Sequence, residues 1–220
     1  MAITLDIQND IAHLAVDDGK ANALSFALIE EFHDVLAKAE AEAKAILISG
    51  RPGRFCAGFD LSVMRESPEK AGELVNAGGH LLLRLFENPL PVVIACTGHA
   101  LAAGGLLLLS ADTRIGTQGD FKIGLNETAI GMVLPVVGIE LPKARLGQDH
   151  FTPAVIQGKM HTPDEAVAAG FLDMAVAPDV LMDTSLAAAG ALSQLPQHSY
   201  HGNKKLIRKA AIATIRESLV

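Results

Sequence analysis

The stretch from residue 121 to residue 135, FKIGLNETAIGMVLP, contains one carboxylate, Glu127, and its only other ionisable side chain is Lys122, five positions earlier. A buried carboxylate without a cationic partner is costly and tends to stay protonated. Such a group needs either backbone hydrogen bonds or a chemical task. Glu127 is therefore a candidate acid or base, and the alternative is a structural carboxylate that accepts backbone N–H groups beside Gly131.

Two segments place small residues directly after extended apolar runs: FCAGFDL at residues 55–61 and TGHALAAGGLLLL at residues 97–109. Small residues let the backbone approach a ligand closely, and N–H groups at a helix start have no intrahelical acceptor. Two such segments facing each other could hold one oxygen atom between two backbone donors. The alternative is a pair of tight turns with close helix packing. Neither segment matches a phosphate-binding loop or a dinucleotide fingerprint.

The elements that must position these segments alternate between strands and helices. Short apolar runs bounded by turn residues predict strands at 3–7, 11–16, 43–50, 113–117, 121–124 and 171–176. Helical spacing and capping residues predict helices at 26–43, 68–86, 162–170 and 201–220. Residues 49–60 are expected to form a glycine-rich loop. This order is typical of an α/β fold without repeats or a flexible linker.

Residues 91–110 form an apolar segment that is long enough to span a bilayer. Thr97-Gly98-His99 and Gly104-Gly105 interrupt it, so we expect a buried strand, a loop and an apolar helix instead of a membrane span. His99 is interpreted as a packed loop side chain. Asp60 and Asp112 follow turns and are expected to cap helices or form salt bridges.

Composition excludes several classes of partner. The 220 residues carry a formal net charge of −7, which disfavours binding to nucleic acid or to an anionic membrane. The two cysteines, Cys56 and Cys96, lack metal-like spacing and fit reduced thiols, and we expect no metal site. The first residues lack the pattern of a signal peptide, so a cytoplasmic protein is expected.

Three motifs together resemble the crotonase (enoyl-CoA hydratase/isomerase) superfamily: GRFCAGFDLSVM, TGHALAAGGLLLLSADTRIG and GKMHTPDEAVAAGFLDMAV. The resemblance implies an α/β fold, a crotonase-like spiral of ββα units with C-terminal helices. It implies a core over residues 1–195 and a C-terminal basic helix over 196–220. It also implies a homotrimer or hexamer that acts on an acyl-CoA thioester, with no cofactor besides the coenzyme A of the substrate.

The resemblance further implies roles for individual residues. The backbone N–H groups of Phe59 and Ala103 would bind the thioester oxygen. Glu127 matches one of two glutamates found in hydratases of the superfamily, and Leu106 stands at the position of the other. IGLNETAIG looks like the Δ3,Δ2-enoyl-CoA isomerases, which have one glutamate there. We therefore expect an isomerase with Glu127 as proton shuttle. The alternatives are a hydratase, a non-catalytic acyl-CoA binder and, without any Ser-His-Asp order to support it, a peptidase.

The remaining site residues are expected to bind substrate. Lys20 and Ala23 match the segment that passes the pantetheine, and the backbone around Cys56, Ala57 and Asp60 lies where the superfamily binds adenine. The acyl pocket or the core would include Leu61, Met64, Leu106 and Leu134, together with Met132 and Val133. The densest basic cluster is expected to meet the 3′-phosphate or to be a solvated helix face; it comprises Lys204, Lys205, Arg208 and Lys209.

Overall fold

The computed structural model describes all 220 residues, and two parallel sheets organise it. The strands are β1 (Ile3–Gln8), β2 (Ile11–Val16), β3 (Ala45–Ser49), β4 (Gly53–Cys56), β5 (Val92–Cys96), β6 (Gly98–Leu101), β7 (Thr113–Thr117), β8 (Ile123–Gly124) and β9 (Met174–Val176). The larger sheet has the order β1-β2-β3-β5-β7-β9, and the smaller sheet has the order β4-β6-β8. Only the β1–β2 hairpin is antiparallel.

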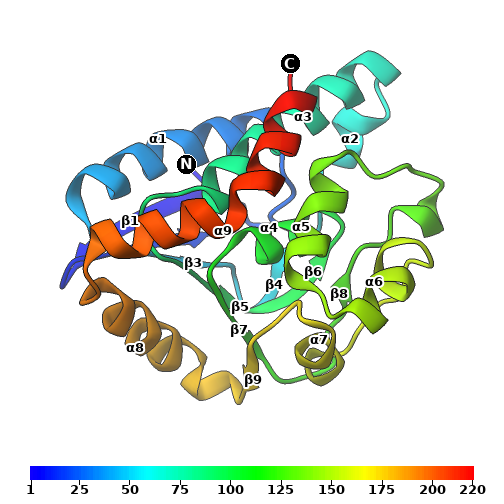
Figure 1. The fold of residues 1–220 in the computed structure, drawn as a ribbon. Helices are drawn as coiled ribbons and strands as arrows, with labels where there is room; N and C mark the ends of the chain where they lie inside the picture. The colour runs from blue at the N-terminus through cyan, green and yellow to red at the C-terminus, as the bar shows by residue number, and fades with distance from the viewer.

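Helices connect and cover these strands (Figure 1). They are α1 (Phe26–Glu42), α2 (Leu61–Met64), α3 (Pro68–Phe86), α4 (Ala103–Ser110), α5 (Val137–Arg145), α6 (Gln148–Val155), α7 (Pro163–Ala169), α8 (Leu181–Ser193) and α9 (Gln197–Ser218), with short 3₁₀ turns η1 (Thr128–Ile130) and η2 (Pro178–Val180). Three times a strand of the larger sheet is followed by a strand of the smaller sheet and then by a helix or turn. This repetition is the expected spiral of ββα units.

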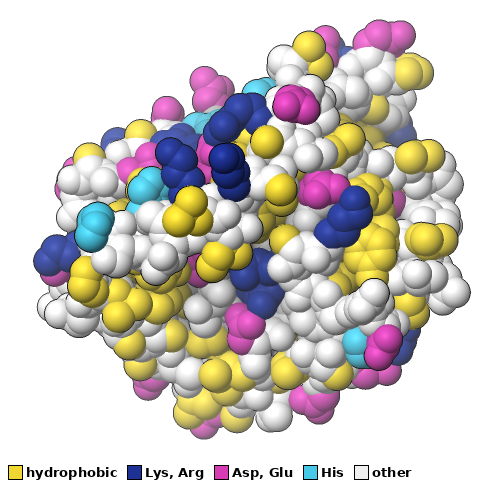
Figure 2. Space-filling model, viewed as in Figure 1, with side chains coloured by type: hydrophobic (Ala, Val, Ile, Leu, Met, Phe, Trp, Pro, Cys, Tyr) yellow, Lys and Arg dark blue, Asp and Glu magenta, His cyan; other side chains and the backbone are white.

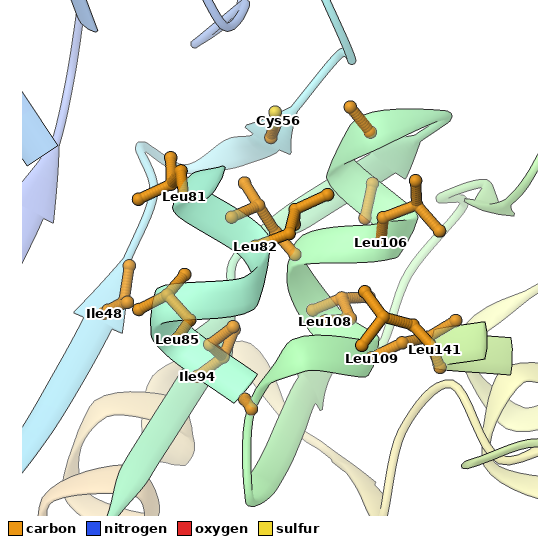
Figure 3. Packing of buried hydrophobic residues seen from close by; sticks show 14 of the residues in the cluster. Ile48, Cys56, Leu81, Leu82, Leu85, Ile94, Leu106, Leu108, Leu109 and Leu141 are labelled. Atoms are coloured by element: carbon orange, nitrogen blue, oxygen red, sulfur yellow. The ribbon is translucent and has the colours of Figure 1, made fainter. Parts of the chain in front are cut away.

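Both faces of the larger sheet are covered, which explains why its central strands are apolar along their whole length. A cluster of 44 buried residues fills the face toward α1, α3 and α4, whereas only 8 residues form the cluster under α8 on the other face. Figure 3 shows the packing of α3 and α4: Leu82 points toward Leu106 and Leu108, whereas Leu81 and Leu85 lie on the side of Ile48. The main core therefore lies between the sheet and the helix that begins at Ala103.

Local signals predicted most elements correctly. Ser25 accepts the Leu28 N–H at the start of α1. Thr162 and Glu165 form a reciprocal capping box at the start of α7, and Gly170 ends that helix in the left-handed conformation. The expected strands over 3–7 and 11–16, which pair as a hairpin, and the expected helix over 68–86 are also confirmed. No helix combines the length and the apolar character that crossing a membrane requires, and residues 91–110 form β5, β6 and α4.

Two expected loops contain strands. Residues Gly53–Cys56 form β4 and residues Gly98–Leu101 form β6, although both segments had been predicted as irregular. These strands are four residues long and pair with each other across a long stretch of sequence. A Cβ atom on Gly98 would lie 2.1 Å from the Gly53 carbonyl carbon, so the pairing depends on glycine at this contact. Glycine has a low strand propensity, which explains why local patterns missed both strands.

Candidate active site

The chain after β4 runs beside Leu24 and leaves the Phe59 N–H without a partner. Leu24 N–H donates to the Gly58 carbonyl at 2.8 Å, and Asp60 N–H donates to the Leu24 carbonyl at 3.0 Å. In extended backbone, successive N–H groups point to opposite sides. The Phe59 N–H therefore points away from Leu24, and no acceptor in the chain receives it.

The start of α4 lies beside the residue before Phe59. A Cβ atom on Gly58 would be 3.0 Å from the Ala102 Cβ and 3.6 Å from the Ala103 nitrogen. Gly58 has φ +98°, so glycine is needed here both for its backbone conformation and for this close approach. As the first residue of α4, Ala103 has no intrahelical acceptor for its N–H, and no other group accepts it. The two unpaired N–H groups thus belong to neighbouring pieces of backbone.

Ala102 turns the chain into α4 with an unusual backbone conformation. Its φ is 50° and its ψ is −121°, a region that side chains disfavour. The Ala102 N–H donates to the Gly124 carbonyl at 3.0 Å, which ties this turn to β8. A Cβ atom on Gly104 would lie 2.2 Å from the Cys56 carbonyl oxygen, so α4 begins directly against the end of β4. The direction of the Ala103 N–H is therefore fixed by contacts with both β4 and β8.

Glu127 follows β8 and is 7% exposed. Its Oε2 atom is buried without a hydrogen-bond partner, and no cation lies within salt-bridge distance of its carboxylate. The alternative of a structural cap is wrong, because the side chain makes no capping bond to the turn η1 that it precedes. Burial raises the pKa of the Glu127 carboxyl above its ordinary value. A carboxylate in this state is suited to accepting a proton.

The segment that carries Glu127 begins in contact with the first turn of α4. A Cβ atom on Gly105 would lie 2.9 Å from the Gly124 carbonyl oxygen and 3.1 Å from Leu125 Cδ2. Leu106, one position further along α4, is 1% exposed and belongs to the core. The position expected to hold a second glutamate in hydratases therefore contributes only hydrocarbon.

The other expected site residues surround this arrangement unevenly. Lys20, Ala57 and Leu61 are exposed, whereas Ala23, Met64 and Leu134 are half-buried, the last two against the core. The Asp60 side chain accepts the Ser62 N–H at the start of α2, as expected of a cap, and it also accepts the Ser62 hydroxyl, which is the main cause that lowers its pKa. Cys56 and Cys96 are free and buried, and burial raises the pKa of the Cys56 thiol to about 12. Asp60 and Cys56 therefore offer a ligand mainly their backbone.

The expectation for the basic cluster is wrong for two of its four members. Lys204 and Arg208 are buried, and each forms an ion pair with Asp112 at 2.7 Å. They join α9 to the core and are not available to a phosphate. Lys205 and Lys209 are exposed, and Figure 2 shows Lys and Arg side chains gathered over α9. The expected salt bridge of Asp112 is confirmed.

A cleft of about 330 Å³ lies elsewhere, between the β1–β2 hairpin and α8. Its lining residues are Asp6, Gln8, Asn9, Ile11, His13 and Leu186. None of them belongs to the arrangement around Glu127. We place the candidate site at the start of α4 because the unpaired N–H groups lie there and the segment that carries the buried acid begins in contact with its first turn, whereas cleft size alone carries no chemistry.

Comparison with known proteins identifies the family. The model of the family described as "Enoyl-CoA hydratase/isomerase" matches residues 6–218. The chain belongs to this family. One solved structure with a similar fold is an enoyl-CoA hydratase/isomerase family protein from Pseudomonas syringae, which superimposes on this chain with a TM-score of 0.96. The two sequences are 39% identical, and the match covers 99% of this chain and 94% of the Pseudomonas protein. The predicted spiral fold is thereby confirmed.

Proteins similar to this chain include both isomerases and hydratases. Human mitochondrial enoyl-CoA delta isomerase 1 is 30% identical over 210 residues, which cover 93% of this chain and 70% of the human protein. The structure of an enoyl-CoA hydratase from Mycobacterium marinum has a TM-score of 0.94 at 32% identity and covers 99% of this chain and 96% of that one. The family is therefore shown, and the choice between the two reactions depends on the site.

Proposed function

We propose that this chain is an enoyl-CoA isomerase that moves a double bond from the Δ3 to the Δ2 position of an acyl-CoA thioester. The observation that carries the proposal is the buried, unpaired carboxylate of Glu127, together with a buried leucine at position 106 where hydratases of the family have a second glutamate. Adding water to a double bond requires groups that hold and activate the water. Moving a proton between two carbons of one substrate requires a single base in a dry pocket.

In the proposed reaction, the Glu127 carboxylate removes a proton from C2 of the 3-enoyl thioester. The electrons of the broken C2–H bond form a C1=C2 double bond and shift the carbonyl π electrons onto the thioester oxygen, which gives a dienolate with the C3=C4 bond intact. In the return step the carbonyl re-forms, the C1=C2 electrons move to C2=C3, and the C3=C4 electrons bind the proton at C4. Between these steps negative charge resides on the thioester oxygen, where the Phe59 and Ala103 N–H groups would donate to it. One such donor is typically worth about 3 kcal/mol. Protonated Glu127 then returns the proton to C4.

The environment of Glu127 suits both halves of this shuttle. A glutamate with an ordinary pKa is too weak a base to take a carbon-bound proton easily, and a carboxyl with a raised pKa is a stronger base that still releases its proton. The N-terminal end of α4 adds a partial positive charge near the developing oxyanion. Leu106, together with Leu61, Met64 and Leu134, would border the acyl chain. Lys20, Ala23, Ala57 and the backbone at Cys56 and Asp60 would contact coenzyme A.

The experiment assays purified protein on a 3-enoyl-CoA and on crotonyl-CoA. We expect conversion of the 3-enoyl thioester to the 2-enoyl thioester without net hydration of crotonyl-CoA. Glu127→Gln should lower kcat by roughly 10²- to 10⁴-fold while substrate affinity is retained. Glu42→Gln, which removes a surface carboxylate from the end of α1, is the matched control and should behave as wild type.

Each alternative predicts a different outcome. Net hydration of crotonyl-CoA that depends on Glu127 would identify a hydratase and refute the isomerase proposal. Binding of acyl-CoA without turnover of either substrate would identify a non-catalytic binder. Turnover that survives Glu127→Gln would remove Glu127 from the mechanism.

Self-association is part of the proposal, and we infer a homotrimer or hexamer. Hydrophobic side chains on the outer face of α9 support it, since Leu206 is 72% exposed and Ile207 is 84% exposed. Exposed apolar groups on one helix face often mark an interface. Light scattering after size exclusion should give a mass of three or six chains, and a monomer at micromolar concentration would contradict the inference.

A further inference from the structure

The Phe59 ring lies directly on the backbone of α3. A Cβ atom on Gly78 would be 2.3 Å from Phe59 Cε1 and 2.6 Å from Phe59 Cζ, so no residue with a side chain fits at position 78 unless the ring moves. Gly78 is buried in the interior of the 19-residue helix α3. Glycine inside a helix costs about 1 kcal/mol relative to alanine. The contact with Phe59 supplies a packing reason for a residue that weakens its own helix.

The contact between the Phe59 ring and Gly78 helps to fix the direction of the Phe59 backbone N–H. The Phe59 main chain is held on one side by the hydrogen bonds of its neighbours, Gly58 and Asp60, with Leu24. The ring on Gly78 is the second point of attachment of the same residue. Because the Phe59 N–H has no acceptor within the chain, its direction follows from these two attachments together.

We propose that Gly78 is a positioning residue for the Phe59 N–H: the absence of a side chain at position 78 seats the Phe59 ring on α3 and so aims that N–H at the substrate carbonyl. The inference rests on the proposed function, in which this N–H stabilises the enolate. Gly78 would touch neither substrate nor reacting atoms, and it would act only through the Phe59 ring.

The next residue provides a matched control. A Cβ atom on Gly79 would lie 2.6 Å from Leu219 Cδ2, on a different side of α3, and Phe59 is not among its neighbours. Gly78→Ala and Gly79→Ala therefore add the same methyl group to adjacent positions of the same helix. Each must displace one large side chain. Only Gly78→Ala displaces the residue that bears the proposed oxyanion donor.

The first measurement compares kcat and KM of the two variants on a 3-enoyl-CoA. Gly78→Ala should lower kcat by roughly 10- to 100-fold with little change in KM, since a displacement of about 1 Å in a catalytic group has effects of this size. Gly79→Ala should keep a kcat within about twofold of wild type, because distant packing changes leave transition-state contacts intact. Equal losses in the two variants, or a wild-type kcat in folded Gly78→Ala, would overturn the proposal.

A second variant tests the route through the ring. Phe59→Leu keeps the backbone N–H but shortens the side chain, so it should make room for a methyl group at position 78. The double variant Gly78→Ala with Phe59→Leu should have a kcat several-fold higher than that of Gly78→Ala and no higher than that of Phe59→Leu alone, the sign of direct coupling between contacting residues. No recovery would show that the loss does not pass through Phe59.

A third measurement applies even if Gly78→Ala fails to fold. Acetoacetyl-CoA forms an enolate that absorbs in the near ultraviolet, and the fraction bound as enolate reports how well the oxyanion is stabilised. Phe59→Leu with Gly78 intact loses the seated ring and should bind a smaller enolate fraction than wild type. An unchanged fraction would refute the positioning role. Absence of turnover in the wild type would instead refute the proposed function, so the two failures are distinguishable.

Discussion

Polar groups are left unpaired at the start of helix α4 and are paired at its end. At its start the Ala103 N–H has no acceptor and Ala102 has a disfavoured backbone conformation, and the segment that contacts this end continues to Glu127, whose Oε2 atom has no partner. At its end, about 12 Å away by helix rise, Asp112 accepts hydrogen bonds from Val92 N–H, Lys204 and Arg208. Arg145 donates to the carbonyl of Leu109 in the last turn of the helix and to the carbonyl of the C-cap residue Ala111.

This difference between the two ends distinguishes charged groups that stabilise the fold from an acid that can react. Buried ions that are fully paired contribute to a fixed architecture, and cations at a helix C-terminus also complement its dipole. Burial lowers the pKa of Lys204 to about 8, and its pair with Asp112 opposes that shift, so the lysine remains largely charged at neutral pH. Glu127 is buried without such compensation. The unsatisfied end of α4 is therefore the end where a ligand would complete the hydrogen bonds.

The largest stability effect should come from the satisfied end. Asp112→Asn leaves Lys204 and Arg208 buried with no carboxylate between them, so the free energy of unfolding should fall by about 3–5 kcal/mol. Urea titration measures this loss. The kcat of the remaining folded protein should stay within about threefold of wild type, because the change is at the far end of α4. A selective loss of kcat without a loss of stability would break the distinction between the two ends.

Replacing Glu127 should have the opposite effect on the free energy of unfolding. Replacing an uncompensated buried carboxylate by Gln should raise the free energy of unfolding by about 1 kcal/mol at neutral pH, although activity is lost. The sign follows from linkage: a carboxyl with a raised pKa ionises more readily in the unfolded chain, so wild type loses stability as pH rises from the unfolded pKa toward the folded one. The advantage of Glu127→Gln in urea titrations should therefore grow from pH 4 upward and then level off. An advantage that is constant across pH would mean that Glu127 is not an uncompensated acid.

The same group sets the acidic limb of activity. Since the base must be ionised, kcat/KM on a 3-enoyl-CoA should fall as pH decreases through the raised pKa of Glu127. The limb should therefore lie at higher pH than an ordinary glutamate would give. A pH–rate profile that is flat down to the range of an unperturbed glutamate would contradict this expectation.

The sequence predicted those features that depend on neighbouring residues. Capping by Ser25 and Thr162 and the apolar context of Glu127 are local patterns, and they were predicted correctly. The strands β4 and β6 were missed because their stability comes from pairing with distant segments. The conformation of Ala102 was also beyond local reasoning, because it depends on a hydrogen bond to Gly124.

Helical spacing in α9 indicates that Lys204 and Arg208 are buried, contrary to the expectation that they bind a phosphate or face solvent. Lys204 and Arg208 are four positions apart, and continuing the same spacing leads to Ile212 and then, three positions on, to Ile215. All four are buried, so they share the core-facing stripe of the helix. The density of positive charge groups Lys204 and Arg208 with Lys205 and Lys209, whereas helical periodicity places the two pairs on different faces of the helix. The density of charge in a sequence segment does not by itself indicate a surface.

A smaller effect would sharpen the comparison between the ends of α4. Ala102→Gly should raise the free energy of unfolding by about 0.5–1 kcal/mol, because relief of the positive φ exceeds the entropy cost of glycine. Ala111→Gly is the matched change at the other end, where φ is −78° and no strain is relieved. It should lower the free energy of unfolding by about as much. If both variants lose stability equally, Ala102 stores no strain.

The smallest effect concerns the cations that α9 leaves exposed. Lys205 and Lys209 lie next in sequence to the buried pair but contact no acid, so they remain candidates for the 3′-phosphate. Lys209→Glu should raise KM for acyl-CoA by about two- to threefold at low salt, and the effect should shrink as salt increases, because exposed pairs are weak and screened. Lys38→Glu, an equal charge change on exposed α1, should leave KM unchanged. Equal KM values for both variants at low salt would show that Lys209 takes no part in binding coenzyme A, and that the buried pair of Lys204 and Arg208 with Asp112 is the structural use of this basic cluster.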